Sequence, residues 1–299
     1  MGGSMLNRSV LIFLISINYL QLSAQEASFD FNENDYVNIS SDVSLQASAG
    51  MTIECWVKAG LDNYSNYAPI VHYMRLGGET EESGFAIQYF DGELRFMVNV
   101  GTGAYDIVGD GLQLWPGMTL DQNVWTHVAG TYDVSTGQAK IFKNGVEQSS
   151  FNTEGGNINW DFIETVDMKI GKSEFNPGGS DGYFDGGVDE VRLWNIALDD
   201  AALQNFMSNC PLGETGLIGY WNFNDGDDDT IDDLTDSGNN GTLVNNGEGD
   251  WDSDVHDNPL CLGSGVCVDS VVISLPFFHS SSLDESMGDD WTFQSYPHG

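Results

Sequence analysis

Positive charge is the scarcest property of this chain. The 299 residues contain 9 lysines and arginines against 46 aspartates and glutamates, which gives a net charge of −37. A surface this acidic repels phosphate groups, so nucleic acids and anionic membranes are strongly disfavoured as partners. The surplus of carboxylates has two interpretations: it keeps an extracellular protein soluble at high salt, or it supplies oxygen ligands for Ca²⁺.

The chain also lacks a hydrophobic run long enough to cross a bilayer, which takes about 20 apolar residues. The run VLIFLISI at residues 10–17 is much shorter, and it follows Arg8. A basic start, a short apolar stretch and small residues around Ala24 are typical of a secretory signal peptide. We therefore expect residues 1–24 to be a signal peptide and the protein to be secreted or held at the cell surface, without membrane insertion.

Cysteine is rare as well. Four cysteines in an exported chain permit three pairings. Cys210 and Cys261 bracket a distinct segment, so we predict a disulfide between them, while Cys267 has no other obvious partner than Cys261. Cys55 lies within an apolar stretch beside Trp56 and is predicted to be a buried free thiol rather than a nucleophile.

Short strands and tight turns are what the chain has in abundance. Residues 125–145 read WTHVAGTYDVSTGQAKIFKNG. The first eight residues suit a half-buried strand, DVSTG supplies a turn with Gly137 in the left-handed region, and AKIFKNG is a second strand that ends in Asn-Gly, the strongest short hairpin signal. Helix is scarce, and the best candidate covers residues 199–208 behind an aspartate cap.

These residues resemble the "W-x-H-V-A-x-T-Y-D … K-x-Y-x-N-G" core of laminin-G-like domains, which belong to the concanavalin A-like lectin and glucanase superfamily. Three further segments resemble that family: FDFNENDYVNI from Phe29, MTIECWVKA from Met51, and DGYFDGGVDEVRLWNIALDDAAL at residues 181–203. The resemblance spans residues 29–206 and implies an all-β fold, a two-sheet antiparallel β-sandwich or jelly roll.

Beyond the signal peptide, the chain is expected to have three parts. Residues 26–209 are predicted to form the laminin-G-like jelly roll. Residues 210–261 form an acidic extension rich in Gly and Asn, similar to an element found next to such jelly rolls, and it is expected to pack Trp221, Phe223 and Leu243 onto the sandwich or a neighbouring domain. Residues 262–299 change character and are interpreted as the start of a further, truncated β module.

Relatives of this fold include glucanases, so a catalytic site is the first alternative to binding. Retaining members carry paired glutamates on one strand, with the carboxyl groups about 5–5.5 Å apart. The nearest approaches here, ETVD from Glu164 and VDEVR from Val188, fail that spacing, and Asp189 and Glu190 are expected to point to opposite faces of a strand. The five histidines lie in no G-x-S-x-G context, and His127 is interpreted as a packing residue.

A structural Ca²⁺ is implied by the resemblance, since relatives commonly hold the ion with a carboxylate of the D-E-V strand and an acidic residue of the opening strand. The matching positions are Asp189 and Asp30, and Gly186 and Gly187 allow the backbone to turn carbonyl groups inward. The alternative is that Asp189 caps a turn or pairs with Arg192.

A sugar-binding surface needs exposed aromatic rings on which pyranose rings stack. Tyr64, Tyr67 and Trp115 are the candidates, since they lie in predicted loops or strand ends beside Gly, Asn and Asp. With 8 Trp, 11 Tyr and 16 Phe in the chain, most aromatic side chains must belong to the core.

The sequence thus predicts a non-catalytic extracellular binding or adhesion module that recognises a glycan or a surface protein, supported by Ca²⁺. This prediction rests on fold resemblance and a missing catalytic pair, and fold alone does not establish function. The alternative is an accessory or spacer domain of a longer secreted hydrolase, a glycosidase or a peptidase.

Overall fold

The computed structural model describes residues 28–31, 35–60, 67–75, 83–90, 92–101, 112–114, 117–152, 155–161, 163–173, 182–225, 229–244, 251–252, 261–262 and 266–267. The chain divides into two compact units, residues 1–268 and residues 269–299, and every described residue belongs to the first. The predicted signal peptide and most of the predicted C-terminal module lie outside the described residues.

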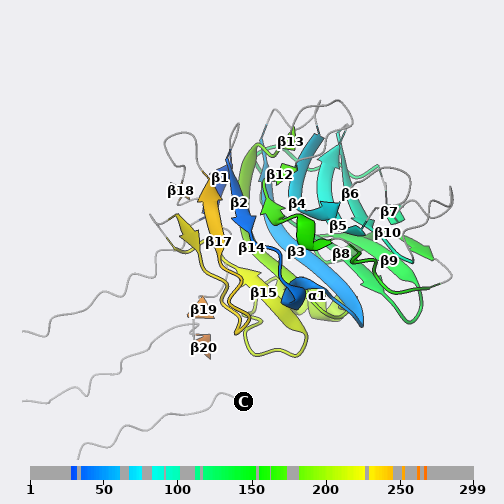
Figure 1. Ribbon diagram of the computed structural model, residues 1–299. Helices are drawn as coiled ribbons and strands as arrows, with labels where there is room; N and C mark the ends of the chain where they lie inside the picture. The colour runs from blue at the N-terminus through cyan, green and yellow to red at the C-terminus, as the bar shows by residue number, and fades with distance from the viewer. Residues whose placement is uncertain are drawn as a thin grey trace, which may run out of the picture. The chain divides into compact units, whose positions relative to one another are not determined.

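Two antiparallel eight-stranded sheets form the body of the protein (Figure 1). In the first, sheet A, the strand order is β10-β9-β8-β3-β14-β1-β18, and β15 also pairs with β14. Its strands are β1 (Ser28–Phe31), β3 (Gly50–Ala59), β8 (Thr126–Asp133), β9 (Gln138–Lys143), β10 (Val146–Asn152), β14 (Gly186–Trp194), β15 (Leu217–Trp221) and β18 (Trp251–Asp252). The predicted all-β, two-sheet sandwich is confirmed.

In the second sheet, sheet B, the order is β16-β17-β2-β11-β4-β5-β6-β7. Its strands are β2 (Tyr36–Ile39), β4 (Tyr67–Arg75), β5 (Ser83–Phe90), β6 (Glu93–Val98), β7 (Leu112–Leu114), β11 (Met168–Ile170), β16 (Thr230–Ile231) and β17 (Gly241–Val244). The smaller elements are the hairpins β12 (Lys172–Ser173) with β13 (Gly182–Tyr183) and β19 (Cys261–Leu262) with β20 (Val266–Cys267), the 3₁₀ turns η1 (Val43–Leu45) and η3 (Ile163–Thr165), and the helix α1 (Asp200–Phe206).

The core lies between the two sheets and follows from alternation along each strand. Phe85, Ile87 and Tyr89 of β5 are fully buried, and so are Val57 of β3 and Val188 of β14, which are register partners in sheet A. Successive side chains of a strand point to opposite faces, so the residues between them lie on the outer face of each sheet, away from the core. Burying one such apolar side chain contributes roughly 1.5–3 kcal/mol.

The predicted hairpin is confirmed. In the first turn, Asp133 Oδ1 accepts hydrogen bonds from the backbone nitrogen and hydroxyl of Ser135, at 2.8 and 2.7 Å, and Gly137 has a φ of 68°. In the second turn, Asn144 and Gly145 have φ values of 51° and 67°. Positive φ at both central residues is what a two-residue hairpin turn requires, and Asn-Gly adopts it at low cost.

The extension at residues 210–261 contributes strands to both sheets. Its β15 pairs with β14, β17 pairs with β2, and β18 pairs with β1. Trp221, Phe223 and Leu243 belong to the main core, and Trp221 Nε1 donates to the carbonyl oxygen of Asn239 at 2.9 Å. The extension is therefore built into the sandwich of the first unit.

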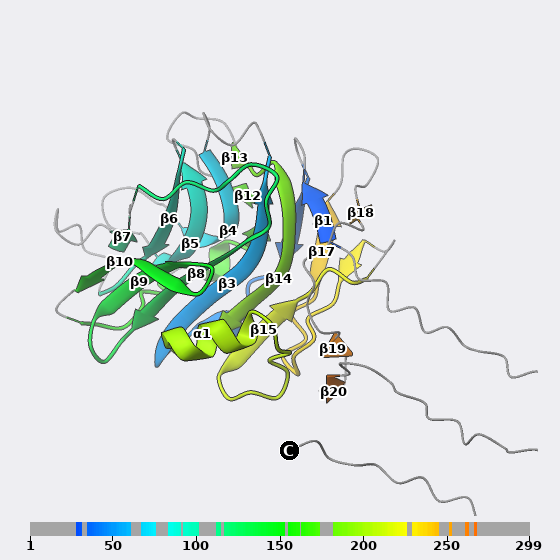
Figure 2. The same cartoon turned by 180° about the vertical axis from the view of Figure 1, so that it is seen from behind.

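Helix α1 lies against the outer face of sheet A (Figure 2). Asp199 caps its start, because the backbone nitrogen of Ala202 donates to Asp199 Oδ1 at 2.8 Å, and the cap agrees with the predicted helix. Leu203 and Phe206 are buried in a second apolar cluster on this face. No helix in the described part of the chain is long and apolar enough to span a membrane.

Candidate functional site

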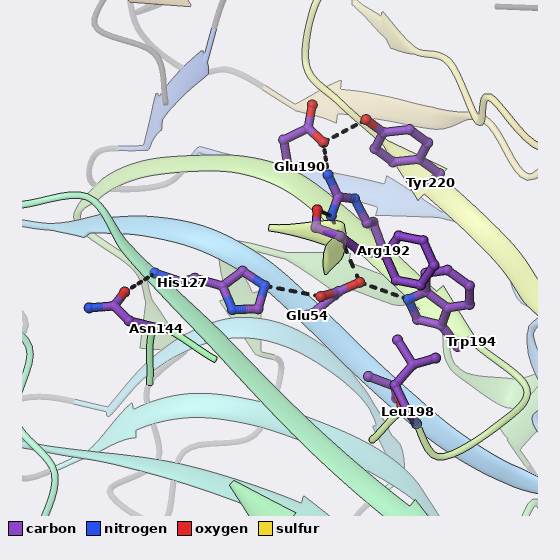
Figure 3. Close-up of polar contacts among 10 residues, drawn as sticks. Glu54, His127, Asn144, Glu190, Arg192, Trp194, Leu198 and Tyr220 are labelled. Carbon is purple, nitrogen blue, oxygen red and sulfur yellow. Dashed lines mark hydrogen bonds and ion pairs between the residues drawn. The ribbon is translucent and has the colours of Figure 1, made fainter. Parts of the chain in front are cut away.

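Residues of three of the four family-like segments and of the extension meet on the outer face of sheet A. Glu54 comes from β3, His127 from β8, Arg192 and Trp194 from β14, and Tyr220 from β15 (Figure 3). These strands are neighbours in the sheet, and Arg192 is the register partner of both Glu54 and Tyr220. The residues that carry the family resemblance thus form one buried polar network.

Glu54 is the centre of this network and is fully buried. Its carboxylate accepts hydrogen bonds from His127 Nε2 at 3.0 Å and from Trp194 Nε1 at 2.9 Å, and Arg192 Nη1 lies 3.8 Å from Glu54 Oε1. Burial by itself would raise the pKa of Glu54, but the hydrogen bond from His127 and the charge of Arg192 outweigh burial and hold that pKa below its ordinary value. The carboxylate is therefore charged and held in place.

A β-bulge brings Glu190 into the same network. The register between β14 and β3 shifts between Asp189 and Arg192, and Glu190 has a φ of 55°. Its carboxylate forms an ion pair with Arg192 and accepts a hydrogen bond of 2.5 Å from the hydroxyl of Tyr220. The expectation that Asp189 and Glu190 point to opposite faces is wrong, because the extra residue of the bulge breaks the alternation of the strand.

Helix α1 closes the network from outside. Arg192 Nη1 donates to the carbonyl oxygen of Phe206 at 2.6 Å, and the Phe206 ring stacks on Trp194 with 4.9 Å between centroids. His127 does pack, with its ring 5.4 Å from that of Trp56, but it also binds Glu54. The carboxylates of Glu54 and Glu190 are bound by side chains of neighbouring strands, so the network has the properties of a structural element.

Of the three aromatic residues predicted to bind sugar, the structure describes only Tyr67. Tyr64 and Trp115 lie outside the described residues. Tyr67 is the first residue of β4 and is only 6% exposed, and burial raises the pKa of its hydroxyl. A Cβ atom on Gly182 of β13 would lie 2.5 Å from Tyr67 Cδ1, so the hairpin β12–β13 packs directly against the ring. The expectation of an exposed stacking platform is wrong for Tyr67.

The two predicted calcium ligands lie near one another on sheet A. Asp30 of β1 is the register partner of Gly187, two residues before Asp189 on β14, so both aspartates belong to the outer face. Asp189 is 3% exposed. The two carboxylates provide the hard oxygen donors that Ca²⁺ prefers. Among the described residues there is no group of three or more His, Cys, Asp or Glu side chains arranged to hold a metal. Backbone carbonyl oxygens or water would have to complete the shell.

The cysteines agree in part with the predictions. Cys55 is a buried free thiol, as predicted, and burial raises its pKa. Cys210 is in a disulfide. The backbone of β19 and β20 places Cys261 opposite Cys267, but the side chains of both lie outside the described residues, so the bridge between Cys210 and Cys261 stays a prediction.

The outer face of sheet B carries polar side chains that the sequence reasoning missed. One row crosses four strands in register, from Asn38 of β2 to Lys169 of β11, His72 of β4 and Ala86 of β5. Gln88 of β5 lies beside this row and pairs with Arg95 of β6. We call this set the sheet B face: Asn38, Tyr67, His72, Gln88, Arg95 and Lys169.

On the sheet B face, His72 and Gln88 each bury a polar atom that has no hydrogen-bond partner in the described part of the chain. His72 is 5% exposed and Gln88 is 3% exposed, and neither His72 Nε2 nor Gln88 Oε1 has a hydrogen-bond partner among the described residues. Burial, with the nearby charge of Lys169, lowers the pKa of His72 to about 3, so its imidazole is neutral at physiological pH. Such orphaned buried polar atoms are uncommon and call for an explanation. A signal in the sequence existed: single polar residues interrupt the apolar stretches PIVHYM and FAIQYF.

A groove of about 760 Å³ lies on the extension, between residues 212–217 and residues 232–240. Leu212, Leu217 and Leu234 provide its apolar lining, and Glu214, Asp232 and Asp236 provide carboxylates. Buried Asp233 organises this loop; it accepts hydrogen bonds from the backbone nitrogens of Tyr220, Thr235 and Asn239. A groove with this lining repels anions and favours cationic or apolar groups.

Comparison with known proteins agrees with this architecture. Among solved structures, a "putative carbohydrate binding protein from Bacteroides ovatus" is similar with a TM-score of 0.57 and 20% identity, covering 79% of this chain and 61% of that chain. The Ruminococcus gnavus IT-sialidase CBM40, bound to α2,3 sialyllactose, is similar with a TM-score of 0.42 and 16% identity, covering 59% of this chain and 94% of that chain. At these identities the similarity concerns the fold. No curated protein matches the chain in sequence.

A laminin G family model, described as the concanavalin A-like lectin/glucanases superfamily, matches residues 31–204. The matched residues are more than half of the chain, and they contain most of the strands of both sheets. The chain belongs to the concanavalin A-like lectin/glucanases superfamily.

Proposed function

We propose that this chain is a non-catalytic, extracellular binding module that recognises a saccharide through the sheet B face. The observation that carries the proposal is the pair of buried atoms, His72 Nε2 and Gln88 Oε1, that lack partners among the described residues. The hydroxyl groups of a sugar both donate and accept hydrogen bonds, so they would satisfy a neutral imidazole and an amide together.

The state of the buried carboxylates supports binding without catalysis. Glu54 is held by His127 and Trp194, and Glu190 by Arg192 and Tyr220. Glu164, the glutamate of the ETVD segment, is exposed in η3, whereas Glu190 belongs to strand β14. A glycosidase needs two carboxyl groups that face the same glycosidic bond, and these residues do not provide such a pair.

The chemistry of the surfaces favours the sheet B face over the groove of the extension. The groove combines leucines with Glu214, Asp232 and Asp236, a lining suited to cations rather than to the hydroxyl groups of a sugar. The sheet B face combines the neutral imidazole of His72 with the amide of Gln88, while the amide nitrogen of Asn38 donates to Asp167 Oδ2 at 2.9 Å. Tyr64 and Trp115, which lie outside the described residues, remain proposed sugar-stacking residues.

The proposal is tested by calorimetric titration of the protein with a panel of oligosaccharides, using Gln88→Met. Removing the amide should weaken saccharide binding by about tenfold or more, because the ligand then loses a buried hydrogen bond. The stability of the fold should stay the same or rise, since an orphaned buried polar group is replaced by an apolar group of similar length. Gln138→Met on β9, at the other sheet, is the matched control.

Two results would contradict the proposal. Equal binding by the wild type and Gln88→Met would remove the sheet B face as the site. Absence of binding to every saccharide would favour the alternative, a spacer or accessory domain of a longer secreted glycosidase or peptidase.

We also propose that Asp30 and Asp189 hold a structural Ca²⁺, which would support β1 against β14.

A further inference from the structure

A third buried polar atom lies beside the sheet B face. Asn99 directly follows β6 and is only 3% exposed, and its Nδ2 has no hydrogen-bond partner in the described part of the chain. Its backbone is fully bonded: the nitrogen donates to the carbonyl oxygen of Gly84 at 2.9 Å, and the carbonyl oxygen accepts from the nitrogen of Asn159 at 2.8 Å. The backbone bonds fix the position of Asn99, and the amide nitrogen of its side chain is left for a ligand.

Alternation along β6 places Asn99 on the outer face of sheet B. Phe96 and Val98 are fully buried in the core, whereas Met97 between them is half-buried. Side chains two positions apart in a strand share a face, so Asn99 lies on the same face as Met97. This is the face that also carries Gln88.

The three buried atoms without partners among the described residues occupy successive rows of this face, where β4, β5 and β6 are neighbours (Figure 1). Each row joins residues of neighbouring strands: Gln88 with Arg95, His72 with Ala86 and Met97, and Asn99 with Gly84. Successive rows are two residues apart along a strand, so the first and third rows are separated by about 13 Å. A ligand that satisfies all three atoms must extend along the strands.

Small residues lie between these polar groups. On β5, Ala86 carries only a methyl group and is fully buried, and Gly84 carries no side chain. Longer side chains flank this strip, with His72 on β4 and with Met97 and Asn99 along β6. Rings of a sugar could lie over such a strip, and the thioether of Met97 offers them an apolar surface.

The hairpin β12–β13 limits the strip beyond the first row. A Cβ atom on Gly182 of β13 would lie 2.5 Å from Tyr67 Cδ1 and 3.3 Å from Pro69 Cδ. Pro69 is the register partner of Gln88, so the hairpin packs beside the first row. A ligand therefore extends from Gln88 towards Asn99 and not past the hairpin.

We propose that the saccharide is an oligosaccharide that lies along β5 and places hydroxyl groups of successive sugars against Gln88, His72 and Asn99. This inference rests on the proposed function; it adds the length and direction of the ligand and assigns Asn99 as a further binding residue. A pyranose ring with its two linking oxygen atoms spans roughly 5 Å, since its bonds are about 1.5 Å long, so a trisaccharide matches the distance between the outer rows. Its hydroxyl groups can both accept from an amide nitrogen and donate to an amide oxygen.

The test is the dependence of affinity on ligand length. Titration calorimetry uses cello-, manno- and xylo-oligosaccharides from the monosaccharide to the pentasaccharide, and the same lengths of any other saccharide that the protein binds. In a series that binds, affinity should rise by about tenfold or more from the disaccharide to the trisaccharide, because one more buried hydrogen bond forms. It should rise little beyond the trisaccharide. This series needs no variant.

Asn99→Leu links the length dependence to the third row. It should remove most of the gain from disaccharide to trisaccharide and weaken the disaccharide by no more than about twofold, because Gln88 and His72 still bind two sugars. The thermal melting midpoint should stay the same or rise, since an apolar group of similar size replaces an amide without a partner. Asn152→Leu, at an exposed position of β10 in sheet A, is the matched control and should leave the gain unchanged.

The outcomes separate the two proposals. Equal affinities for the monosaccharide and the trisaccharide, with binding weakened by Gln88→Met, would overturn the inference and leave the proposed function standing. A gain at the trisaccharide that a folded Asn99→Leu variant retains would place the third sugar elsewhere and would also overturn the inference. Binding of no member of any series, and of no other saccharide, would overturn both.

Discussion

Glu54 and Arg192 carry opposite charges into a part of the protein from which water is excluded. Changing Glu54 to Ala removes the hydrogen-bond acceptor of His127 and Trp194. It also removes one of the two carboxylates that neutralise the charge of Arg192. Breaking a buried ion pair in this way costs about 3–5 kcal/mol, so we expect a loss of this size in the free energy of unfolding, measured with urea.

Glu147→Ala is the matched control. Glu147 pairs with Lys140 at 2.9 Å, but the side chains are 33% and 25% exposed. An exposed pair contributes at most about 1 kcal/mol. If Glu54→Ala destabilises the protein no more than Glu147→Ala does, the network under α1 is not a stabilising element.

The burial of His72 makes stability depend on pH. The folded protein binds a proton at this imidazole only near pH 3, whereas the unfolded chain binds it near 6.5. Between these values the unfolded state holds more protons, so the free energy of unfolding falls as the pH is lowered through this window. We expect His72→Gln to reduce this loss by an amount on the order of a few kcal/mol between neutral pH and pH ~4.

Urea unfolding of both proteins across the pH range measures this difference. The pKa of Glu54 is lowered in the folded state, so its stabilisation is present above the unfolded pKa of 4.5 and is lost as the pH falls below it. Glu54 is present in both proteins, and the comparison therefore isolates His72. Parallel pH profiles would show that folding does not lower the pKa of His72.

At the scale of elements, the strands of the extension complete the sheets. β15 covers one edge of β14, β17 covers one edge of β2, and Trp221 is fully buried in the core. A chain of residues 25–209 lacks all of these, so it exposes core side chains and unpaired strand edges. We expect residues 25–268 to give a cooperative urea transition by circular dichroism and residues 25–209 to lose it.

A chain that ends at residue 244 is the control, because it keeps β15 and β17 and lacks β18. With both chains measured under reducing conditions, so that the disulfide of Cys210 contributes to neither, it should retain most of the stability of the longer chain. If residues 25–209 unfold as cooperatively as residues 25–268 and at the same urea concentration, the jelly roll is complete without the extension.

At the scale of the whole molecule, the net charge of −37 opposes folding through self-repulsion. Calcium should raise the melting midpoint if it binds the folded state at Asp30 and Asp189, by mass action. The measurement compares CaCl₂ with chelator at constant ionic strength, because salt alone screens the repulsion and also stabilises the protein. Asp189→Asn should remove the calcium-dependent rise.

Asp161→Asn, at an exposed position outside the strands, is the control for that variant. It should leave the rise unchanged. A midpoint that is the same with calcium and chelator would remove the metal from the account of this fold, and an equal rise in wild type and Asp189→Asn would place the ion elsewhere.

The sequence by itself determined the features that depend on residues close together in the chain. The turns at Gly137 and Asn144, the cap at Asp199 and the burial of Cys55 within β3 were all predictable, and so was the family from its strand motifs. These features arise from the backbone preferences of single residues, from hydrogen bonds that span two or three positions, and from alternation along one strand.

The tertiary structure decided which distant residues meet and which side chains are buried. Glu54 binds His127 and Trp194, which lie 73 and 140 positions away, and only the strand order β8-β3-β14 brings them together. The bulge at Glu190, the burial of Tyr67 and the polar row through His72 likewise follow from register and packing between strands. A pattern within one strand shows that two faces exist, but what covers each face is set by segments elsewhere in the chain.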